Sequence, residues 1–227
     1  MIRVGRCTYS SGKKIDPEYP GFTKIVVMMK SHSKWWPLSP YELKNDNGHI
    51  MENIWQFSKV YATIPQTIQY KSRYDKTIIW SSSKEKHYKN GQLLPAYHEW
   101  RHKGMNAPYA IRYPVGFENR SKCLFALKEE NGEPLNYIES RKAIYVPVYC
   151  DFVRKQPLFT DLQKRLQKGE QLLIVEVDGP HSESLSYYQE NMALILLLLR
   201  EILWKPQKRI SPLCLMMKRI PLDMVIV

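Results

Sequence analysis

Apolar and polar positions recur along this chain in two periods, which predicts both strands and helices. The segment 24–30 is rich in β-branched residues and bounded by lysines, and 171–177 has the continuous apolar character of a buried strand. Between them, leucines recur every fourth residue around 160–168, which predicts a helix that Thr160 caps and Gly169 ends. The mixed order of these elements predicts an α+β fold.

A helix predicted over about residues 49–62 has an unusual polar face. Residues three and four apart on a helix are neighbours, so this face carries Glu52, Trp55, Gln56 and Lys59. A carboxylate, an indole, a carboxamide and an ammonium in one row suit an active site. The alternative is an ordinary amphipathic helix, whose core side would be Ile54, Phe57 and Val60. The pattern alone leaves both interpretations open.

The sequence around this helix resembles the opening of the NADAR (YbiA-like) family over roughly residues 23 to 62. The features that carry the resemblance are the run Trp36–Leu43, the turn Asp46–Gly48 and the pattern Glu52-x-x-Trp55-Gln56-x-x-Lys59. In that family a histidine usually follows the glutamate, whereas this chain has Asn53. The resemblance implies a YbiA-like fold for the N-terminal half of the chain.

The resemblance also implies an N-glycosidase, which hydrolyses the bond between a ribosyl carbon and a base-type nitrogen. The expected substrate is a nucleotide-like intermediate of the riboflavin pathway or ADP-ribosylated guanine. Such cleavage passes through an oxocarbenium-like transition state, which needs a carboxylate near the anomeric carbon and a base that activates water. Glu52 matches the carboxylate by position. The expected substrate-binding residues are Trp55 on a base, Lys59 and Arg112 on phosphates, and Gln56 and Trp36 beside them. No cofactor and no metal are expected.

Arg112 is a candidate on its own residues as well. Tyr109, Ile111 and Tyr113 alternate with Ala110 and Arg112, as in a half-buried strand. An arginine on the inner side of such a strand is rare unless it is paired, which makes Arg112 a candidate anion clamp. The alternative is an Arg112 side chain that points to solvent.

A second group of polar residues follows the strand predicted over 171–177. Glu176, Asp178 and His181 lie where that strand ends and a helix begins. Such positions gather ligands in α/β proteins, so Asp178 and His181 are candidates for activating water. This expectation comes from their place in the sequence and is not carried over from the family. The alternative is a tight turn in which Asp178 caps the next helix and His181 is exposed.

The charge of the chain leads to a competing class of function. Lysine and arginine number 34 against 22 acidic residues, a net charge of +12, which favours polyanionic partners but also serves solubility. A non-catalytic protein that binds nucleic acid or another partner could use the aromatic residues interleaved with lysine in 34–36 and 86–89. An enzyme needs Glu52, Trp55 and Lys59 in one pocket, whereas a binding protein needs a basic face with exposed aromatic rings.

Neither the cysteines nor the histidines form a complete set of metal ligands in the sequence. The four cysteines are widely separated, so reduced thiols in the cytoplasm are expected. His98 and His102 are four residues apart, as two zinc ligands on a helix are, but no further ligand cluster accompanies them. An ordinary surface helix is therefore favoured there.

The chain is expected to stay out of the membrane, and its tail has a composition of its own. No hydrophobic signal core opens the sequence, and the longest apolar run, 192–199, is far shorter than the roughly 20 residues of a membrane span. We expect an α+β domain over 1–191 and an apolar, basic tail over 192–227. One hypothesis is that this tail is translated out of frame, which would make the chain a truncated pseudoenzyme and which resequencing tests. The alternative is a helix that docks on the core or on a partner.

Overall fold

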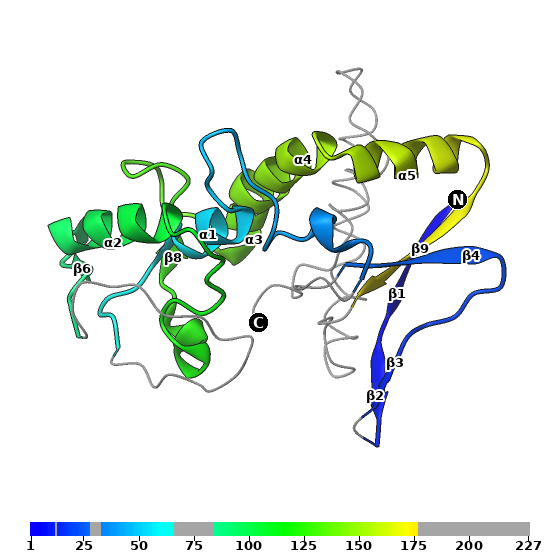
Figure 1. The fold of residues 1–227 in the computed structure, drawn as a ribbon. Coiled ribbons are helices and arrows are strands. Elements are labelled where there is room, and N and C mark those ends of the chain that lie inside the picture. The colour runs from blue at the N-terminus through cyan, green and yellow to red at the C-terminus, as the bar shows by residue number, and fades with distance from the viewer. Residues whose placement is uncertain (12, 28–32, 66–83, 177–227) are drawn as a thin grey trace.

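The computed structural model of the chain describes residues 1–11, 13–27, 33–65 and 84–176. These residues form both helices and strands, which confirms the α+β class in its general form. Figure 1 shows a small sheet at one end of the molecule and short helices with small strand pairs at the other.

The central strand of the sheet is β9 (Gln171–Glu176), which lies between β1 (Ile2–Arg6) and β4 (Phe22–Val26). Both neighbours run parallel to it. Parallel neighbours need a crossover connection, and here the helical part of the chain lies between β4 and β9. The strand predicted over 171–177 is confirmed over 171–176, whereas the one expected over 24–30 begins earlier and ends at Val26.

Helix α5 (Pro157–Gln167) covers one face of this sheet, and α4 (Val146–Arg154) packs beside it in the same core cluster. Phe159 and Leu162 of α5 pack in one core cluster with Leu172 of β9. Figure 1 shows α5 lying across the sheet.

The start of α5 differs from the prediction that Thr160 is its N-cap. The helix begins at Pro157 after Gln156, because proline is already set for the first helical position. Its end agrees with the prediction, since Gly169 follows with a φ of +90°.

A nearly continuous helical run precedes α5. It consists of α3 (Tyr137–Ser140), the π-helical turn η3 (Arg141–Tyr145) and α4. Pro147 lies inside this helical run, where it has no backbone N–H to donate to the π-helical turn before it. A capping box between Asn136 and Glu139 opens α3.

The part of the molecule away from the three-stranded sheet is built on α1 (Met51–Gln56) and α2 (Pro95–Met105). The helix predicted over 49–62 is too long, because β5 (Lys59–Val60) pairs with β8 (Phe125–Ala126) and ends the helical path after Gln56. Gly104 of α2 lies so close to the ring of Phe57 that any side chain at Gly104 would collide with it.

Six further elements complete the described fold. They are the hairpins β2 (Thr8–Ser10) with β3 (Lys13–Ile15) and β6 (Tyr88–Lys89) with β7 (Gln92–Leu93), and the 3-10 helices η1 (Trp36–Leu38) and η2 (Phe117–Lys122).

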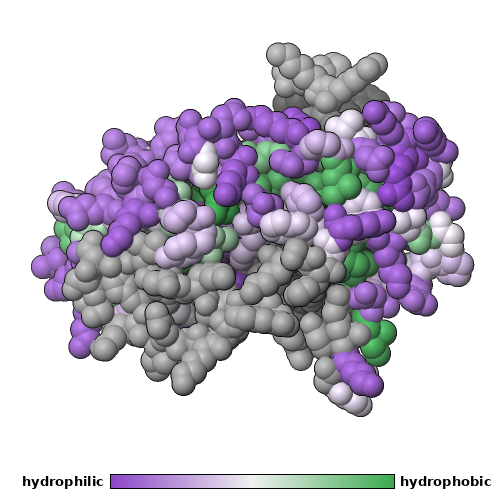
Figure 2. Space-filling view, viewed as in Figure 1, coloured by the Kyte–Doolittle hydropathy of each residue, from purple (hydrophilic) through white to green (hydrophobic). Residues whose placement is uncertain are grey.

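Hydrophilic residues dominate the face of the molecule drawn in Figure 2, above all over the helices along its upper edge. Within the described ranges, no helix combines the length and the apolar character that crossing a membrane requires. Within the part of the chain that the structure describes, no disulfide joins Cys7, Cys123 and Cys150.

The buried imidazole of His87 makes stability depend on pH. Its ring lies 5.2 Å from that of Trp100, its two nitrogens make no hydrogen bond to any residue in the described part of the chain, and burial lowers its pKa to about 4. The carboxylate of Glu85 is 3.7 Å away. The unfolded chain binds a proton below pH 6.5, the ordinary value, so stability is lost as the pH falls from 6.5 towards 4.

We expect the His87 imidazole to contribute about 3 kcal/mol to the difference in unfolding free energy between pH 7.5 and pH 4. Urea denaturation at the two pH values measures it. The His87→Phe variant should lose this part of the difference, and His98→Phe, on a partly exposed side chain of α2, should keep it. An equal pH dependence in wild type and His87→Phe would contradict the expectation.

Candidate functional site

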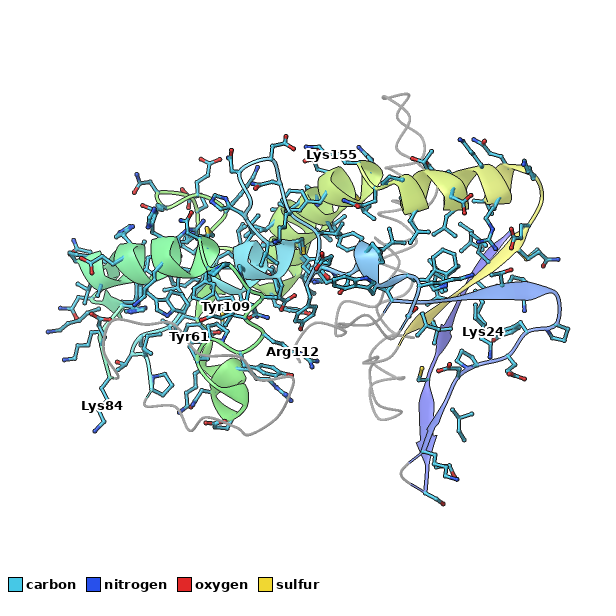
Figure 3. The ribbon with its side chains drawn as sticks, viewed as in Figure 1. Lys24, Tyr61, Lys84, Tyr109, Arg112 and Lys155 are labelled. Carbon is cyan, nitrogen blue, oxygen red and sulfur yellow. The ribbon has the colours of Figure 1, made fainter. Side chains whose placement is uncertain are left out.

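A cavity of about 330 Å³ opens beside α1. Its walls come from α1 and β5, from the segment 112–116, from η2 and β8, and from the start of α3. The lining residues are Trp55, Gln56, Lys59, Tyr61, Arg112, Tyr113, Pro114, Val115, Gly116, Arg120, Ser121, Cys123, Leu124, Phe125, Ala126, Leu135, Tyr137 and Ser140. Figure 3 labels two of them, Tyr61 and Arg112, below α1 in this view. The volume suits part of a nucleotide-sized ligand.

A row of hydrogen bonds runs along the predicted face of α1 to the wall of this cavity. The Gln56 Nε2 donates to Glu52 Oε1 over 2.7 Å, and the Lys59 Nζ donates to Gln56 Oε1 over 2.9 Å. These two bonds hold the Gln56 carboxamide in one orientation, with its NH2 group toward the Glu52 carboxylate and its oxygen toward the Lys59 ammonium. Gln56 and Lys59 line the cavity, whereas Glu52 is buried behind them and is not among the lining residues.

Glu52 is a buried carboxylate among cations. Burial raises its pKa, and the hydrogen bond from Gln56 and the charges of Lys59, Arg112 and Arg141 oppose that rise. Three cations therefore surround one carboxylate, which leaves the site with an excess of positive charge. Such an excess suits an anionic ligand.

Lys59 responds to the same environment in the opposite sense. Burial lowers the pKa of its ammonium, and the negative charge of Glu52 opposes that change. The two groups thus favour each other's charged form, as expected for a buried pair linked through one amide.

Trp55 belongs to the wall of the cavity, but its ring is enclosed. Only 1% of the side chain is exposed, the Lys59 Nζ lies 5.0 Å from the ring centroid, and the Tyr145 ring meets it edge to face at 5.4 Å. The Trp55 ring therefore has little free face on which a base could stack. The less buried aromatic side chains of the lining are Tyr113, Phe125 and Tyr137.

Arg112 reaches the cavity from irregular backbone, and the strand predicted over 109–113 is wrong. The backbone before Arg112 is held by the side chain of Asn53 in α1 instead of by a neighbouring strand. The Asn53 Nδ2 donates to the carbonyls of Ala107 and Tyr109, and its Oδ1 accepts from the backbone N–H of Ile111. The Arg112 side chain is 8% exposed, which contradicts the alternative of an arginine directed to solvent. Asn53, which departs from the family pattern, thus holds the segment that delivers Arg112.

The other expected site residues lie elsewhere. Trp36 is half-buried in η1 and does not line the cavity. Asp178 and His181 lie outside the described residues, as does the tail 192–227, and Glu176 is described only as the last backbone position of β9.

The aromatic residues expected to serve a nucleic-acid-binding face are largely internal. Trp35 is 3% exposed and its Nε1 donates to the carbonyl of Lys24, and His87 is fully buried. Tyr88 packs edge to face on Phe125. Trp35 and His87 are therefore unavailable for stacking on exposed bases.

Metal binding finds no support in the described part of the chain. No group of three or more candidate ligands comes together there. His98 on α2 pairs with Glu130 at 2.9 Å, and His102 is exposed on the same helix, as the surface-helix interpretation predicts.

Several lining residues escaped the sequence analysis, among them Tyr113, Arg120, Phe125, Tyr137 and Ser140. No short motif unites them, because they come from four segments that meet only in the fold. Asn136 and Glu139, which open α3 as a capping box, were the one local signal next to Tyr137 and Ser140.

Comparison with protein-family models finds no match, and neither the curated proteins nor the solved structures show one.

Proposed function

We propose that this chain is an N-glycosidase of the NADAR (YbiA-like) type, with a YbiA-like fold in its N-terminal half. It hydrolyses the ribosyl–nitrogen bond of a nucleotide-derived or ADP-ribosylated substrate. The observation that carries the proposal is the hydrogen-bonded row Glu52–Gln56–Lys59, which joins a buried carboxylate to the wall of a cavity with excess positive charge.

The carboxylate has the role that glycosidic cleavage requires. As the bond to nitrogen breaks, positive charge develops on the ribosyl ring, and a nearby carboxylate stabilises that charge. Glu52 is this group, and Gln56 orients it through its fixed amide. Glu52 lies behind Gln56, which leaves two ways for it to act. The Gln56 side chain moves aside when the substrate binds, or the negative charge of Glu52 stabilises the ribosyl cation without direct contact. Asp178 and His181 remain our candidates for activating water.

The lining of the cavity favours a ligand with one anionic and one aromatic part. Lys59 and Arg112 supply cationic groups for a phosphate. Phe125, Tyr137 and Leu135 supply apolar surface for a base. A nucleotide combines both parts. Reduced thiols and a substrate of this kind agree with a cytoplasmic location, which is part of the proposal.

The test is release of base or ribose by the full chain from two substrates, ADP-ribosylated DNA and the ribosylamino intermediate of the riboflavin pathway. We expect release from one of them in a time course followed by liquid chromatography. A preparation that releases neither product, yet binds unmodified DNA in a salt-sensitive way, would reject the glycosidase and favour the non-catalytic nucleic-acid-binding protein.

A further inference from the structure

Arg141 is a buried cation directly behind the aromatic wall of the cavity. It is 4% exposed, and its guanidinium carbon lies 3.6 Å from the ring centroid of Tyr145 and 5.3 Å from that of Trp55. Its Nη1 makes no hydrogen bond to any residue in the described ranges. Such a position is costly for an arginine, because a buried cation loses its hydration. The burial of Arg141 therefore indicates a specific role for its charge.

The backbone at Arg141 is as unusual as its side chain. Arg141 opens η3, a π-helical turn between α3 and α4. Inserted π turns change the direction of the residues that follow and are frequent at functional sites. Here the turn follows Ser140, which lines the cavity, and carries both Arg141 and Tyr145.

Two cations contact the Trp55 indole. The Lys59 Nζ lies 5.0 Å and the Arg141 guanidinium carbon 5.3 Å from its centroid, and the rings of Tyr137 and Tyr145 meet it at edge-to-face angles. Desolvated cation–π contacts are among the stronger contacts that an aromatic ring makes. Arg141 therefore fixes the ring that forms the cavity wall.

We propose that Arg141 is a positioning residue of this site: it holds the Trp55 indole in the cavity wall and supplies positive charge to Glu52 and Lys59 from behind that wall. Its effect on hydrolysis rests on the proposed function, whereas its effect on the ring and on the carboxylate does not.

The electrostatics of the site agree with this role. The charge of Arg141 lowers the pKa of Glu52 and also that of Lys59. The other groups that face Glu52 are Gln56, Lys59, Arg112 and the hydroxyl of Tyr41, whose own pKa is raised by burial and by Glu52. Arg141 therefore favours the ionised form of Glu52.

The experiment compares Arg141→Met, Arg141→Lys and wild type in the full chain. Protein labelled with 5-fluorotryptophan reports the Trp55 ring by ¹⁹F NMR, with Trp55→Phe to assign the signal. Protein labelled with ¹³C in the glutamate carboxyl groups reports the titration of Glu52, with Glu52→Gln to assign it. Affinity for ADP-ribose is measured by calorimetry. Arg154→Met, an exposed arginine at the end of α4, is the control.

We expect Arg141→Met to shift and broaden the Trp55 resonance, to move the Glu52 titration to higher pH, and to weaken ADP-ribose binding about tenfold. Arg141→Lys should restore the titration, because it keeps the charge, and restore the ring resonance only in part. A Glu52 titration unchanged in both variants would overturn the proposal, even if stability fell. If Arg141→Met does not fold, Arg141→Lys decides alone: an unperturbed Trp55 resonance in it would also overturn the proposal.

The outcomes separate this inference from the proposed function. Shifts of the Trp55 resonance and the Glu52 titration in a chain that releases no product would support the positioning role and reject the glycosidase. Product release that is equal in wild type and Arg141→Met, with no spectral change, would reject the positioning role alone.

Discussion

Glu52→Gln is expected to reduce product release about 10³-fold while ADP-ribose binding changes little. Glutamine keeps the size of the side chain and can still accept a hydrogen bond from Gln56 Nε2, but it lacks the negative charge that stabilises the ribosyl cation. Single-turnover rates on the substrate that wild type cleaves measure the loss.

The pH profile gives this prediction a second measurement. Burial raises the pKa of Glu52, so the ionised form is lost at a higher pH than for an exposed carboxyl group. Wild-type activity should therefore rise with pH through this raised value, and Glu52→Gln should lack that rise. Glu133→Gln, on an exposed side chain, is the matched control and should behave as wild type. Full activity in Glu52→Gln would remove Glu52 from the mechanism.

The local part of the site could be predicted because it depends on spacing alone. Glu52 and Gln56 are one helical turn apart, so any helix through them brings their side chains together, and the structure joins them by a hydrogen bond. Local patterns also predicted β9 from its apolar run and the end of α5 from Gly169, but they missed the start of α5. Lys59 is the instructive case: it bonds to Gln56 as predicted, but from a strand and not from the helix.

The rest of the site depends on long-range pairing, which no local pattern contains. Lys59 lies on β5 because residues 125–126 pair with it, far along the chain. Arg112 lies beside α1 because Asn53 binds the backbone before it, and alternation in 109–113 wrongly favoured a strand. Arg141 had no signal, because a π turn has no recognised sequence pattern in this segment.

Asn53→Ala is expected to lower the unfolding free energy by about 4 kcal/mol and to weaken ADP-ribose binding more than tenfold. Alanine leaves the Ile111 N–H without the Asn53 Oδ1 at 2.8 Å, and the Tyr109 carbonyl without the Asn53 Nδ2 at 2.9 Å. Ile111 is fully buried, so water cannot replace the lost acceptor. The segment then relaxes, and Arg112, which follows it directly, leaves the cavity wall. Urea denaturation and calorimetry measure the two effects.

The affinity for ADP-ribose distinguishes a role of Asn53 in the binding site from a purely structural role. If Asn53 acts by placing Arg112, then Arg112→Met in the wild-type background should weaken ADP-ribose binding about as much as Asn53→Ala does, and combining the two changes should add little. Their effects on stability should differ, because Arg112→Met leaves the three hydrogen bonds of Asn53 in place. Asn131→Ala, on an exposed turn, should change neither quantity. Additive losses of affinity would mean that Asn53 does not act through Arg112, and that the segment 107–111 supports the fold without setting the anion site.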